Sequence, residues 1–285
     1  MDLAFTKMHG CGNDFIVVDD RSIDLDLDAT AVAMLCDRHF GIGADGMILV
    51  RPATDPAADF YMHYSNADGS IAEMCGNGIR VFAKYLSDRS LVKDGRLTVQ
   101  TLGGLKVIEI VPDTAGDFAL ARVDMGAPVL MAADVPTTLP GDPVVDAPVV
   151  TEAGKANVTC VSMGNPHAVL WVDDVDDAPV TTLGPAIEEL DVFPRATNVE
   201  FADVVDASRL RLRVWERGVG ETLACGTGAC ATLVAGVLTG RCGRSAIVEL
   251  PGGELRIEWP EGQGVFMTGP AEQVFEGVWH IPDED

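Results

Sequence analysis

Short apolar runs, many with a two-residue alternation, recur along the whole chain and predict a fold rich in strands. Helical spacing is confined to four places, at residues 29–38, 79–86, 185–189 and 229–238. The last of these has little polar surface, so we expect it to be buried on all sides. A Pro-rich segment, 127–148, is expected to link two halves of the chain. The expected strands are 15–18, 47–50, 97–100, 106–111 and 119–125, then 158–162, 167–172, 209–216, 246–250 and 255–259.

The two most apolar helical runs each follow a cysteine that is surrounded by glycines. Cys75 begins the sequence Cys-Gly-Asn-Gly, and Cys225 begins Cys-Gly-Thr-Gly. Other markers occur at nearly equal distances from each cysteine, namely Gly12-Asn13 and Gly164-Asn165 upstream, and Gly103-Gly104 and Gly252-Gly253 downstream. Such ordered self-similarity indicates an internal repeat. We therefore expect two halves: residues 1–122 plus 267–285, carrying Cys75, and residues 123–266, carrying Cys225.

The sequence places both thiols where a helix begins. Backbone N–H groups and the positive end of the helix dipole converge there, so we expect a lowered thiol pKa and a pocket for an anion. Duplication of thiol, glycines and helix has no packing rationale. By contrast, Cys11, Cys36, Cys160 and Cys242 are interpreted as small apolar residues, and Cys230, four residues after Cys225, as helix packing rather than half of a metal or redox pair.

Charge and composition exclude several classes of protein. The 285 residues include 44 acids and 20 bases, which leave a net charge of −24. This acidity argues against nucleic acid or an anionic membrane as a partner. Fifteen of the bases are arginines, and with the acid excess this favours a protein that works in high salt. No apolar run reaches the ~18 residues of a membrane span, no secretory signal is seen at the N-terminus, and the seven cysteines are unpaired in pattern, so we expect a cytoplasmic protein with free thiols.

Uncharged amides and one basic side chain are further candidates for a site. Asparagine is common in turns for reasons of its own backbone, so each such residue taken alone has a structural explanation. A histidine on a strand is often a satisfied core residue, and an arginine beside Glu216 and Glu221 could form a surface ion pair or clamp a carboxylate. These candidates are Asn13, Asn66, Asn165, Asn198, His167 and Arg217.

Seven segments together resemble the diaminopimelate epimerase family, and the resemblance runs from about residue 3 to beyond residue 269. The resemblance implies an enzyme that interconverts LL- and meso-2,6-diaminopimelate in lysine and peptidoglycan precursor biosynthesis, with no cofactor and no metal. It also implies an α/β (α+β) fold of two pseudo-symmetric halves, each a curved sheet or barrel around a central helix, with the site between them. A homodimer is the implied assembly. The matching segments are 7–15, 41–46, 66–70, 74–80, 163–167, 216–218 and 224–229.

The resemblance also implies roles for individual residues. Cys225 would be the base and Cys75 the acid in the LL-to-meso direction. His167 and Glu216 would tune the thiols, and Glu216 would also meet an ammonium group of the substrate. Gly46 stands where many family members have glutamine, so one contact is expected to be missing. The residues implied to bind substrate are Asn13, Asn66, Gly76, Asn77, Asn165, Asn198, Glu216, Arg217, Gly226 and Thr227.

Chemistry supports this reading independently. The α-proton of an amino acid is far less acidic than a thiol, and no pyridoxal lysine motif supplies an electron sink, so the site must stabilise an anion. Inversion needs a base on one face and an acid on the other, which two thiols provide. Three alternatives remain open. The first is another two-cysteine racemase, acting on proline; Asn77 argues against it, because histidine is expected at that position in such a racemase. The others are a thiol–disulfide oxidoreductase and a non-catalytic protein that binds a diamino acid.

The acidic composition generates a prediction about salt. At low ionic strength the repulsion among the −24 net charges is unscreened, so the melting temperature is expected to rise from dilute buffer to molar KCl. Differential scanning calorimetry across that range measures it. A melting temperature that does not change would remove the high-salt interpretation.

Overall fold

The computed structural model describes residues 2–280, which divide into two compact units. Of the described residues, unit 1 comprises 2–123 and 269–280, and unit 2 comprises Asp124–Thr268. The chain passes from one unit to the other within β7 (Phe118–Gly126) and again within β16 (Val265–Gly269). Within residues 2–280, no helix is both long and apolar enough to cross a membrane.

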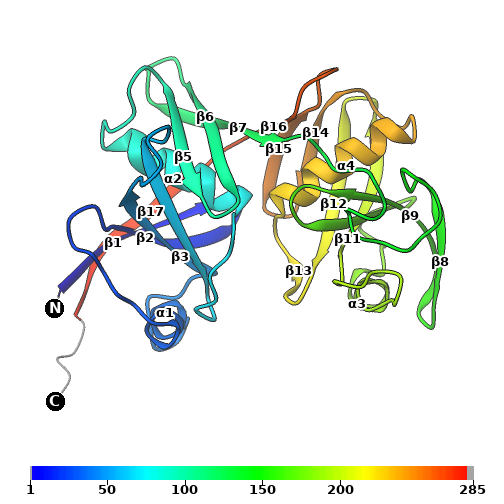
Figure 1. Cartoon of the computed structure of the whole chain (residues 1–285), viewed down its shortest axis with the longest axis horizontal. Helices are drawn as coiled ribbons and strands as arrows, with labels where there is room; N and C mark the ends of the chain where they lie inside the picture. The colour runs from blue at the N-terminus through cyan, green and yellow to red at the C-terminus, as the bar shows by residue number, and fades with distance from the viewer. Residues whose placement is uncertain (1, 281–285) are drawn as a thin grey trace. The chain divides into compact units, whose positions relative to one another are not determined.

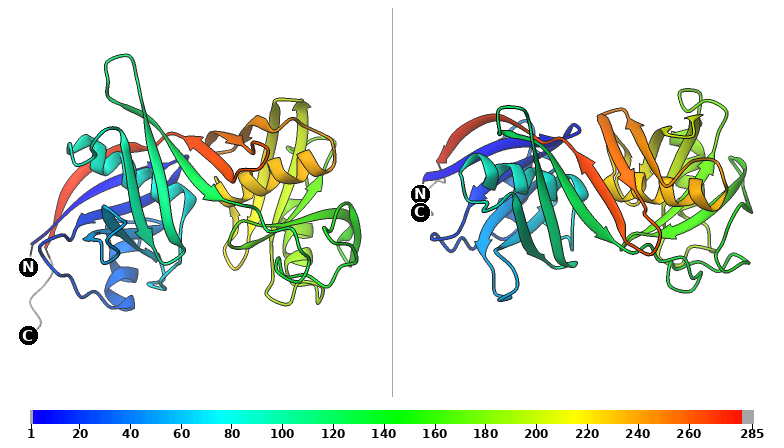
Figure 2. Two further views of the ribbon diagram at one scale, coloured as in Figure 1. Left: turned by 45° about the horizontal axis from the view of Figure 1, so that its top comes forward. Right: turned by 90° about the horizontal axis from the view of Figure 1, so that it is seen from above.

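Unit 1 is a sheet of eight strands in the order β17-β1-β2-β3-β4-β5-β6-β7. The β2–β3 and β4–β5 pairs are parallel, and the other pairs are antiparallel. Figures 1 and 2 show α2 lying among these strands, and α2 contacts β1, β2, β3, β4, β6 and β17. The elements are β1 (Asp2–Gly10), β2 (Asn13–Asp19), α1 (Ala29–Cys36), β3 (Gly46–Pro52), β4 (Phe60–Asn66), α2 (Gly76–Asp88), β5 (Arg96–Thr101), β6 (Gly104–Pro112), β7 (Phe118–Gly126) and β17 (Glu272–His280).

Unit 2 repeats this topology in the order β8-β9-β10-β11-β12-β14-β15-β16, with the short β13 paired to β12. Its parallel pairs, β10–β11 and β12–β14, fall at the same places in the order as those of unit 1. The repeat expected from the sequence is therefore visible strand by strand. The elements are β8 (Ala147–Thr151), β9 (Gly154–Ser162), β10 (Pro166–Trp171), α3 (Val180–Glu188), β11 (Asn198–Asp206), β12 (Arg209–Glu216), β13 (Gly220–Thr222), α4 (Gly226–Leu238), β14 (Ser245–Leu250), β15 (Gly253–Glu258) and β16 (Val265–Gly269).

The helix α4 is apolar around its whole circumference, as expected, and is surrounded by strands of unit 2. It contacts β9, β10, β11, β12, β14 and β15. Ala229, Leu233 and Val234 are fully buried. Gly236 fits this close packing, because a Cβ there would lie 2.5 Å from the Cys242 sulfur and would force that side chain to move. A helix without a polar face is stable in this fold only because strands cover every side of it.

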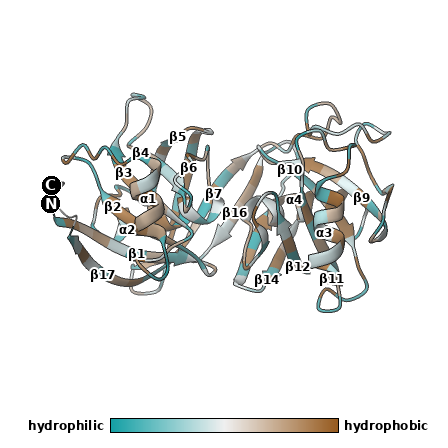
Figure 3. Cartoon of the chain, turned by 90° about the horizontal axis from the view of Figure 1, so that it is seen from below, coloured by the Kyte–Doolittle hydropathy of each residue, from teal (hydrophilic) through white to brown (hydrophobic). Residues whose placement is uncertain are grey.

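The fold class expected from the sequence is confirmed, in that each unit is a mixed sheet around one central helix. The expectation that segment 127–148 links two halves is wrong, because this segment belongs to unit 2. Val135, Leu139 and Val144 are buried in the core of that unit. Strands β1, β4, β8, β11, β13, β16 and β17 were not expected. Figure 3 shows brown, apolar positions along β17. Val274 and Val278 are nevertheless more than half exposed, so apolar residues on this strand do not mark a buried face.

The packing of α4 generates a prediction about stability. Leu233→Ala removes a fully buried side chain, so the free energy of unfolding is expected to fall by about 2–5 kcal/mol. Urea unfolding followed by circular dichroism measures the change. Val219→Ala is the control, because Val219 is 75% exposed and its truncation is expected to cost less than about 0.5 kcal/mol. Equal costs for the two variants would contradict the buried position of α4.

Candidate active site

Cys75 is the N-cap residue of α2. Its backbone is extended (φ −133°, ψ 121°), and its sulfur accepts a hydrogen bond from the Gly78 N–H at 3.4 Å. Gly78 also keeps the first turn open, because a Cβ there would lie 3.3 Å from both the Cys75 Cβ and the Ile48 Cδ1. The sequence thus placed this thiol correctly at a helix N-terminus, where backbone N–H groups are available to an anion.

Amide side chains surround the Cys75 thiol. The sulfur lies 3.8 Å from Asn13 Oδ1, and Asn77 donates from Nδ2 to the same oxygen at 3.1 Å. Arg80, which is fully buried, donates to Asn77 Oδ1 at 3.0 Å and to the Gly76 carbonyl at 2.9 Å. The structure thereby brings three expected site residues, Asn13, Cys75 and Asn77, together at one end of α2.

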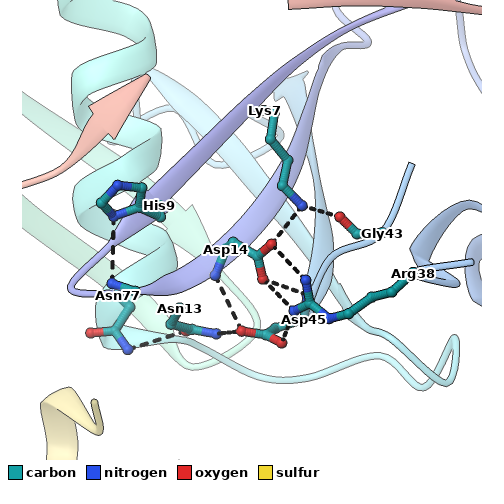
Figure 4. A network of polar contacts seen from close by, with 9 residues as sticks. Lys7, His9, Asn13, Asp14, Arg38, Gly43, Asp45 and Asn77 are labelled. Carbon is teal, nitrogen blue, oxygen red and sulfur yellow. Dashed lines mark hydrogen bonds and ion pairs between the residues drawn. The ribbon is translucent and has the colours of Figure 1, made fainter. Parts of the chain in front are cut away.

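A network of ion pairs lies behind Asn13 (Figure 4). Asn13 donates from Nδ2 to Asp45 at 2.8 Å, and Arg38 bonds both Asp45, at 2.6 Å, and Asp14, at 2.7 Å. Lys7 pairs with Asp14 at 2.6 Å. Burial raises the pKa of Asp14, but hydrogen bonds from Arg38 and Lys7 outweigh it and hold that pKa well below its usual range. Asp14 is therefore a carboxylate at neutral pH.

Asn66 is the last residue of β4 and pairs with Gly46 on the neighbouring strand β3. Its Oδ1 accepts a hydrogen bond from the Tyr64 hydroxyl at 2.9 Å, and its Nδ2 donates to Ser70 Oγ at 3.0 Å. A Cβ at Gly46 would lie 2.6 Å from the Tyr64 ring and from the Ser65 carbonyl oxygen. The aromatic ring of Tyr64 thus lies where a side chain at position 46 would begin.

Cys225 is the N-cap residue of α4 and repeats the arrangement of Cys75. It is extended (φ −122°, ψ 110°), and its sulfur accepts a hydrogen bond from the Gly228 N–H at 3.4 Å. The Thr227 hydroxyl lies 3.4 Å from the sulfur. The other neighbour differs from that of Cys75: the half-buried carboxyl of Glu216, which accepts a hydrogen bond from the Thr222 hydroxyl, lies close enough to the thiol to raise its pKa.

The expected lowering of the Cys225 pKa is wrong. Burial raises the pKa of this thiol well above its ordinary value, and the nearby carboxylates of Glu216 and Glu200 raise it further. Hydrogen bonds from Thr227 and the Gly228 N–H act in the opposite direction but are smaller. Burial likewise raises the pKa of Glu216. Desolvation of the charged forms, which sequence spacing does not reveal, outweighs the helix N-terminus here.

His167 is fully buried, and both of its ring nitrogens have oxygen partners. Nδ1 lies 2.6 Å from Glu200 Oε1, and Nε2 lies 3.0 Å from Asn165 Oδ1. Glu200 is also fully buried, and its second oxygen has no hydrogen-bond partner among residues 2–280. Burial raises the pKa of Glu200, and His167 only partly offsets this. His167 is therefore tied to Asn165 and Glu200 rather than directly to a thiol.

Asn198 and Arg217 meet at the start of β11 and the end of β12. Asn198 donates from Nδ2 to the Pro166 carbonyl at 2.8 Å and accepts from the Arg217 N–H at 2.9 Å. The exposed Arg217 guanidinium donates to the Arg195 carbonyl at 3.0 Å and forms no ion pair within the part of the chain that the structure describes. Glu221 instead pairs with Arg213 at 2.7 Å. Arg217 therefore retains a positive charge that suits a carboxylate ligand.

Four residues of the site were not expected from the sequence: Tyr64, Arg80, Asp45 and Glu200. Two of them, Arg80 and Glu200, could have been found from the sequence. Each is a charged residue within an otherwise apolar, buried element: Arg80 lies in α2, and Glu200 lies between Val199 and Phe201. The partners of Tyr64 and Asp45 depend on strand pairing and carry no local signal.

Comparison with known proteins agrees with these features. The family model described as diaminopimelate epimerase matches residues 5–131 and 159–274. The chain is 51% identical over 280 residues to a diaminopimelate epimerase of Pelotomaculum thermopropionicum, covering 97% of this chain and 99% of the relative. It is 48% identical over 276 residues to one of Methanococcus maripaludis, covering 96% and 99%. Among solved structures, a probable proline racemase from Agrobacterium radiobacter K84 shares the fold (TM-score 0.72, 15% identity, 99% of this chain and 93% of that chain).

The surroundings of Cys225 generate a prediction about thiol reactivity. Glu216→Gln removes a negative charge that raises the pKa of Cys225, so alkylation of Cys225 by iodoacetamide at pH 8 is expected to become severalfold faster. Peptide mapping by mass spectrometry quantifies the modified residue. Glu249→Gln, which removes a partner of Arg209 on the surface, should leave the rate unchanged. A slower or unchanged reaction in Glu216→Gln would show that this carboxylate does not act on the thiol.

Proposed function

Because the chain belongs to the diaminopimelate epimerase family, we propose that it interconverts LL- and meso-2,6-diaminopimelate, with Cys75 and Cys225 as the two acid–base groups. The observation that carries this proposal is the duplicated environment of the thiols. In each unit a cysteine caps the central helix, and its sulfur accepts the N–H of the third residue onward at 3.4 Å. Inversion of a stereocentre requires two such groups, one for each face of the carbon.

The N-termini of α2 and α4 suit the anion that forms when the α-proton leaves. Negative charge spreads onto the reacting carboxylate, and backbone N–H groups that point at it stabilise it without reorganisation. We assign this task to the first turns, at Gly76 and Asn77 in unit 1 and at Gly226 and Thr227 in unit 2. The largely buried first turns of both helices strengthen these interactions by excluding water.

The neighbours of the thiols support different roles for them. The Thr227 hydroxyl lies 3.4 Å from the Cys225 sulfur and can donate a hydrogen bond to a thiolate. Cys75 lies beside the amide oxygen of Asn13, which accepts a hydrogen bond but does not take a proton at neutral pH. We therefore assign Cys225 as the base and Cys75 as the acid in the LL-to-meso direction, and the reverse in the opposite direction.

Recognition of the second amino-acid head is assigned to amides and one cation. Arg217 supplies an exposed guanidinium that is free of ion pairs within the described residues, so it can bind a carboxylate through two hydrogen bonds. Asn165 and Asn198 are held in place by His167 and by backbone groups, respectively. Asn66 is held by Tyr64. The half-buried Glu216 would additionally meet an ammonium group.

The wider setting follows from the same proposal. The reaction would serve lysine and peptidoglycan precursor biosynthesis, and a homodimer remains an expectation of the family resemblance. All seven cysteines are free in the structure. Catalytic thiols must stay reduced, so a reducing compartment such as the cytoplasm suits this chemistry.

Isotope exchange tests the two-thiol reaction. In D2O, one thiol removes the α-proton from one face while the other delivers a deuteron to the opposite face. Early in the LL-to-meso reaction, deuterium is expected at the new stereocentre of the product and barely in recovered LL substrate. Cys75→Ala should reduce net epimerisation by about 100-fold or more, while Cys225 still exchanges the α-proton of the LL isomer. NMR and mass spectrometry of separated isomers measure both.

Two controls delimit this test. Cys242→Ala changes a cysteine outside both helix N-termini and should leave exchange and epimerisation as in wild type. In the second control, proline is supplied instead of diaminopimelate, which tests the alternative that the chain is a proline racemase. Equal early labelling of substrate and product by the wild-type chain would indicate a single base serving both faces, and turnover of proline alone would contradict the proposed substrate.

A further inference from the structure

A chain of directed hydrogen bonds crosses unit 1 and passes beside the Cys75 thiol. It runs from Arg80 through Asn77 and Asn13 to Asp45, and Figure 4 shows the last three of these residues side by side. An arginine can only donate and a carboxylate can only accept, so the two ends of the chain have opposite and fixed hydrogen-bonding character. The two amides between them are therefore constrained in direction.

The Arg80 end fixes the amide of Asn77. Arg80 is fully buried and donates to Asn77 Oδ1 at 3.0 Å, which turns the oxygen of Asn77 toward the guanidinium. The Asn77 Nδ2 consequently faces Asn13 and donates to its Oδ1 at 3.1 Å. A reversed Asn77 would place its NH2 group against a guanidinium, two donors facing each other.

The Asp45 end fixes the amide of Asn13 from the other side. Asp45 Oδ2 accepts from Asn13 Nδ2 at 2.8 Å, and its Oδ1 accepts from Arg38 at 2.6 Å. A reversed Asn13 would direct its carbonyl oxygen at a carboxylate and its NH2 at the NH2 of Asn77. Both contacts would be repulsive, so Asn13 keeps its oxygen on the side of Cys75.

The consequence concerns the thiol. Asn13 Oδ1 lies 3.8 Å from the Cys75 sulfur and accepts a hydrogen bond from an S–H group, but it has no proton with which to stabilise S⁻. We propose that Asp45 is a positioning residue: by orienting Asn13 it keeps a carbonyl oxygen against the Cys75 sulfur, which favours the protonated thiol over the thiolate. Its significance for the reaction rests on the proposed function, in which Cys75 donates a proton to the LL-derived anion.

Unit 2 lacks this device at the corresponding place. Asn165, the counterpart of Asn13 in the repeat, turns its oxygen to His167 instead. The Thr227 hydroxyl, 3.4 Å from the Cys225 sulfur, can donate a hydrogen bond to a thiolate. The repeat therefore supplies the same helix N-terminus twice, but an oriented amide oxygen beside the sulfur only at Cys75.

The charged side chains of β1 and β2 near Asn13 are already paired. On β1, Lys7 pairs with Asp14, and His9 lies 3.9 Å from Glu272. On β2, Asp14 is shared by Lys7 and Arg38. Arg80 on α2 also contacts the Cys11 sulfur at 3.5 Å. Asp45 is the group among these that bonds the side chain of Asn13.

Asp45→Asn tests the proposal. Both oxygens of Asp45 face donors, and the introduced amide has only one oxygen. The charged Arg38 takes that oxygen, so an NH2 group faces Asn13 and favours reversal of its amide. An N–H donor then replaces the acceptor beside Cys75, and one hydrogen bond to a charged group changes its equilibrium by roughly ten-fold or more. Alkylation of Cys75 by iodoacetamide at pH 8, measured by peptide mapping on the full chain, is expected to accelerate about ten-fold.

The kinetic expectation is a fall in kcat for LL-diaminopimelate of about ten-fold with KM within about two-fold, since proton donation rather than binding is weakened. Asp19→Asn is the matched control. Asp19 also uses both carboxylate oxygens, on Arg21, but it lies at the other end of β2. This variant should alkylate and turn over like wild type.

The double variant Asn13→Ala/Asp45→Asn tests whether Asp45 acts through Asn13. Its Cys75 alkylation rate should equal that of Asn13→Ala alone. The Asp45 side chain is 43% exposed, so replacement is expected to preserve the fold. In a second variant, Asp45→Ala, only Asn77 still orients the Asn13 amide, so a smaller acceleration is expected than in Asp45→Asn. Wild-type alkylation rates at Cys75 in both folded Asp45 variants would overturn the proposal. A wild-type chain that does not epimerise diaminopimelate would refute the proposed function, while the alkylation rates would still decide the role of Asp45.

Discussion

The buried helix at the centre of each unit is the constraint on which the rest of the structure depends. Because strands cover α4 on every side, its N-terminus is the end at which its backbone donors need a partner from outside the helix. A cysteine at this cap satisfies one donor with its sulfur and leaves others for an anion. The same holds for Cys75 on α2. The position of each thiol therefore depends on the packing of the helix that it caps, and a change that loosens α2 or α4 displaces Cys75 or Cys225.

The two units have the same topology, but the side chains around their thiols differ. The two units share the order of strands and the positions of their parallel pairs. Their thiols nevertheless meet different neighbours: amides oriented by ion pairs surround Cys75, whereas a hydroxyl and a carboxyl surround Cys225. The proposed reaction, which removes a proton from one face and adds one to the other, needs this difference, since in it the two thiols hold different protonation states at the same moment.

Sequence patterns predicted what is local and missed what arises in three dimensions. The Cys-Gly-x-Gly motif located both helix N-termini, because capping depends on adjacent residues. Strand β11 was missed because its buried run contains Glu200 and Asp203, whose partners, His167 and Arg211, come from other strands. The start of α3 was placed five residues late, since Pro185 suggested a beginning although it lies inside the helix. The pKa of Cys225 was misjudged because burial is a property of the fold.

The raised pKa values in unit 2 bear on how a buried thiol can act as a base. A thiolate alone in such surroundings is costly, because charge loses its hydration there. The Thr227 hydroxyl and the Gly228 N–H can each donate a hydrogen bond to the Cys225 sulfur, which lowers this cost. The Asn13 amide oxygen beside Cys75 can only accept a hydrogen bond. In the proposed mechanism, a hydroxyl donor at one thiol and an oriented amide acceptor at the other give the two thiols their opposite roles.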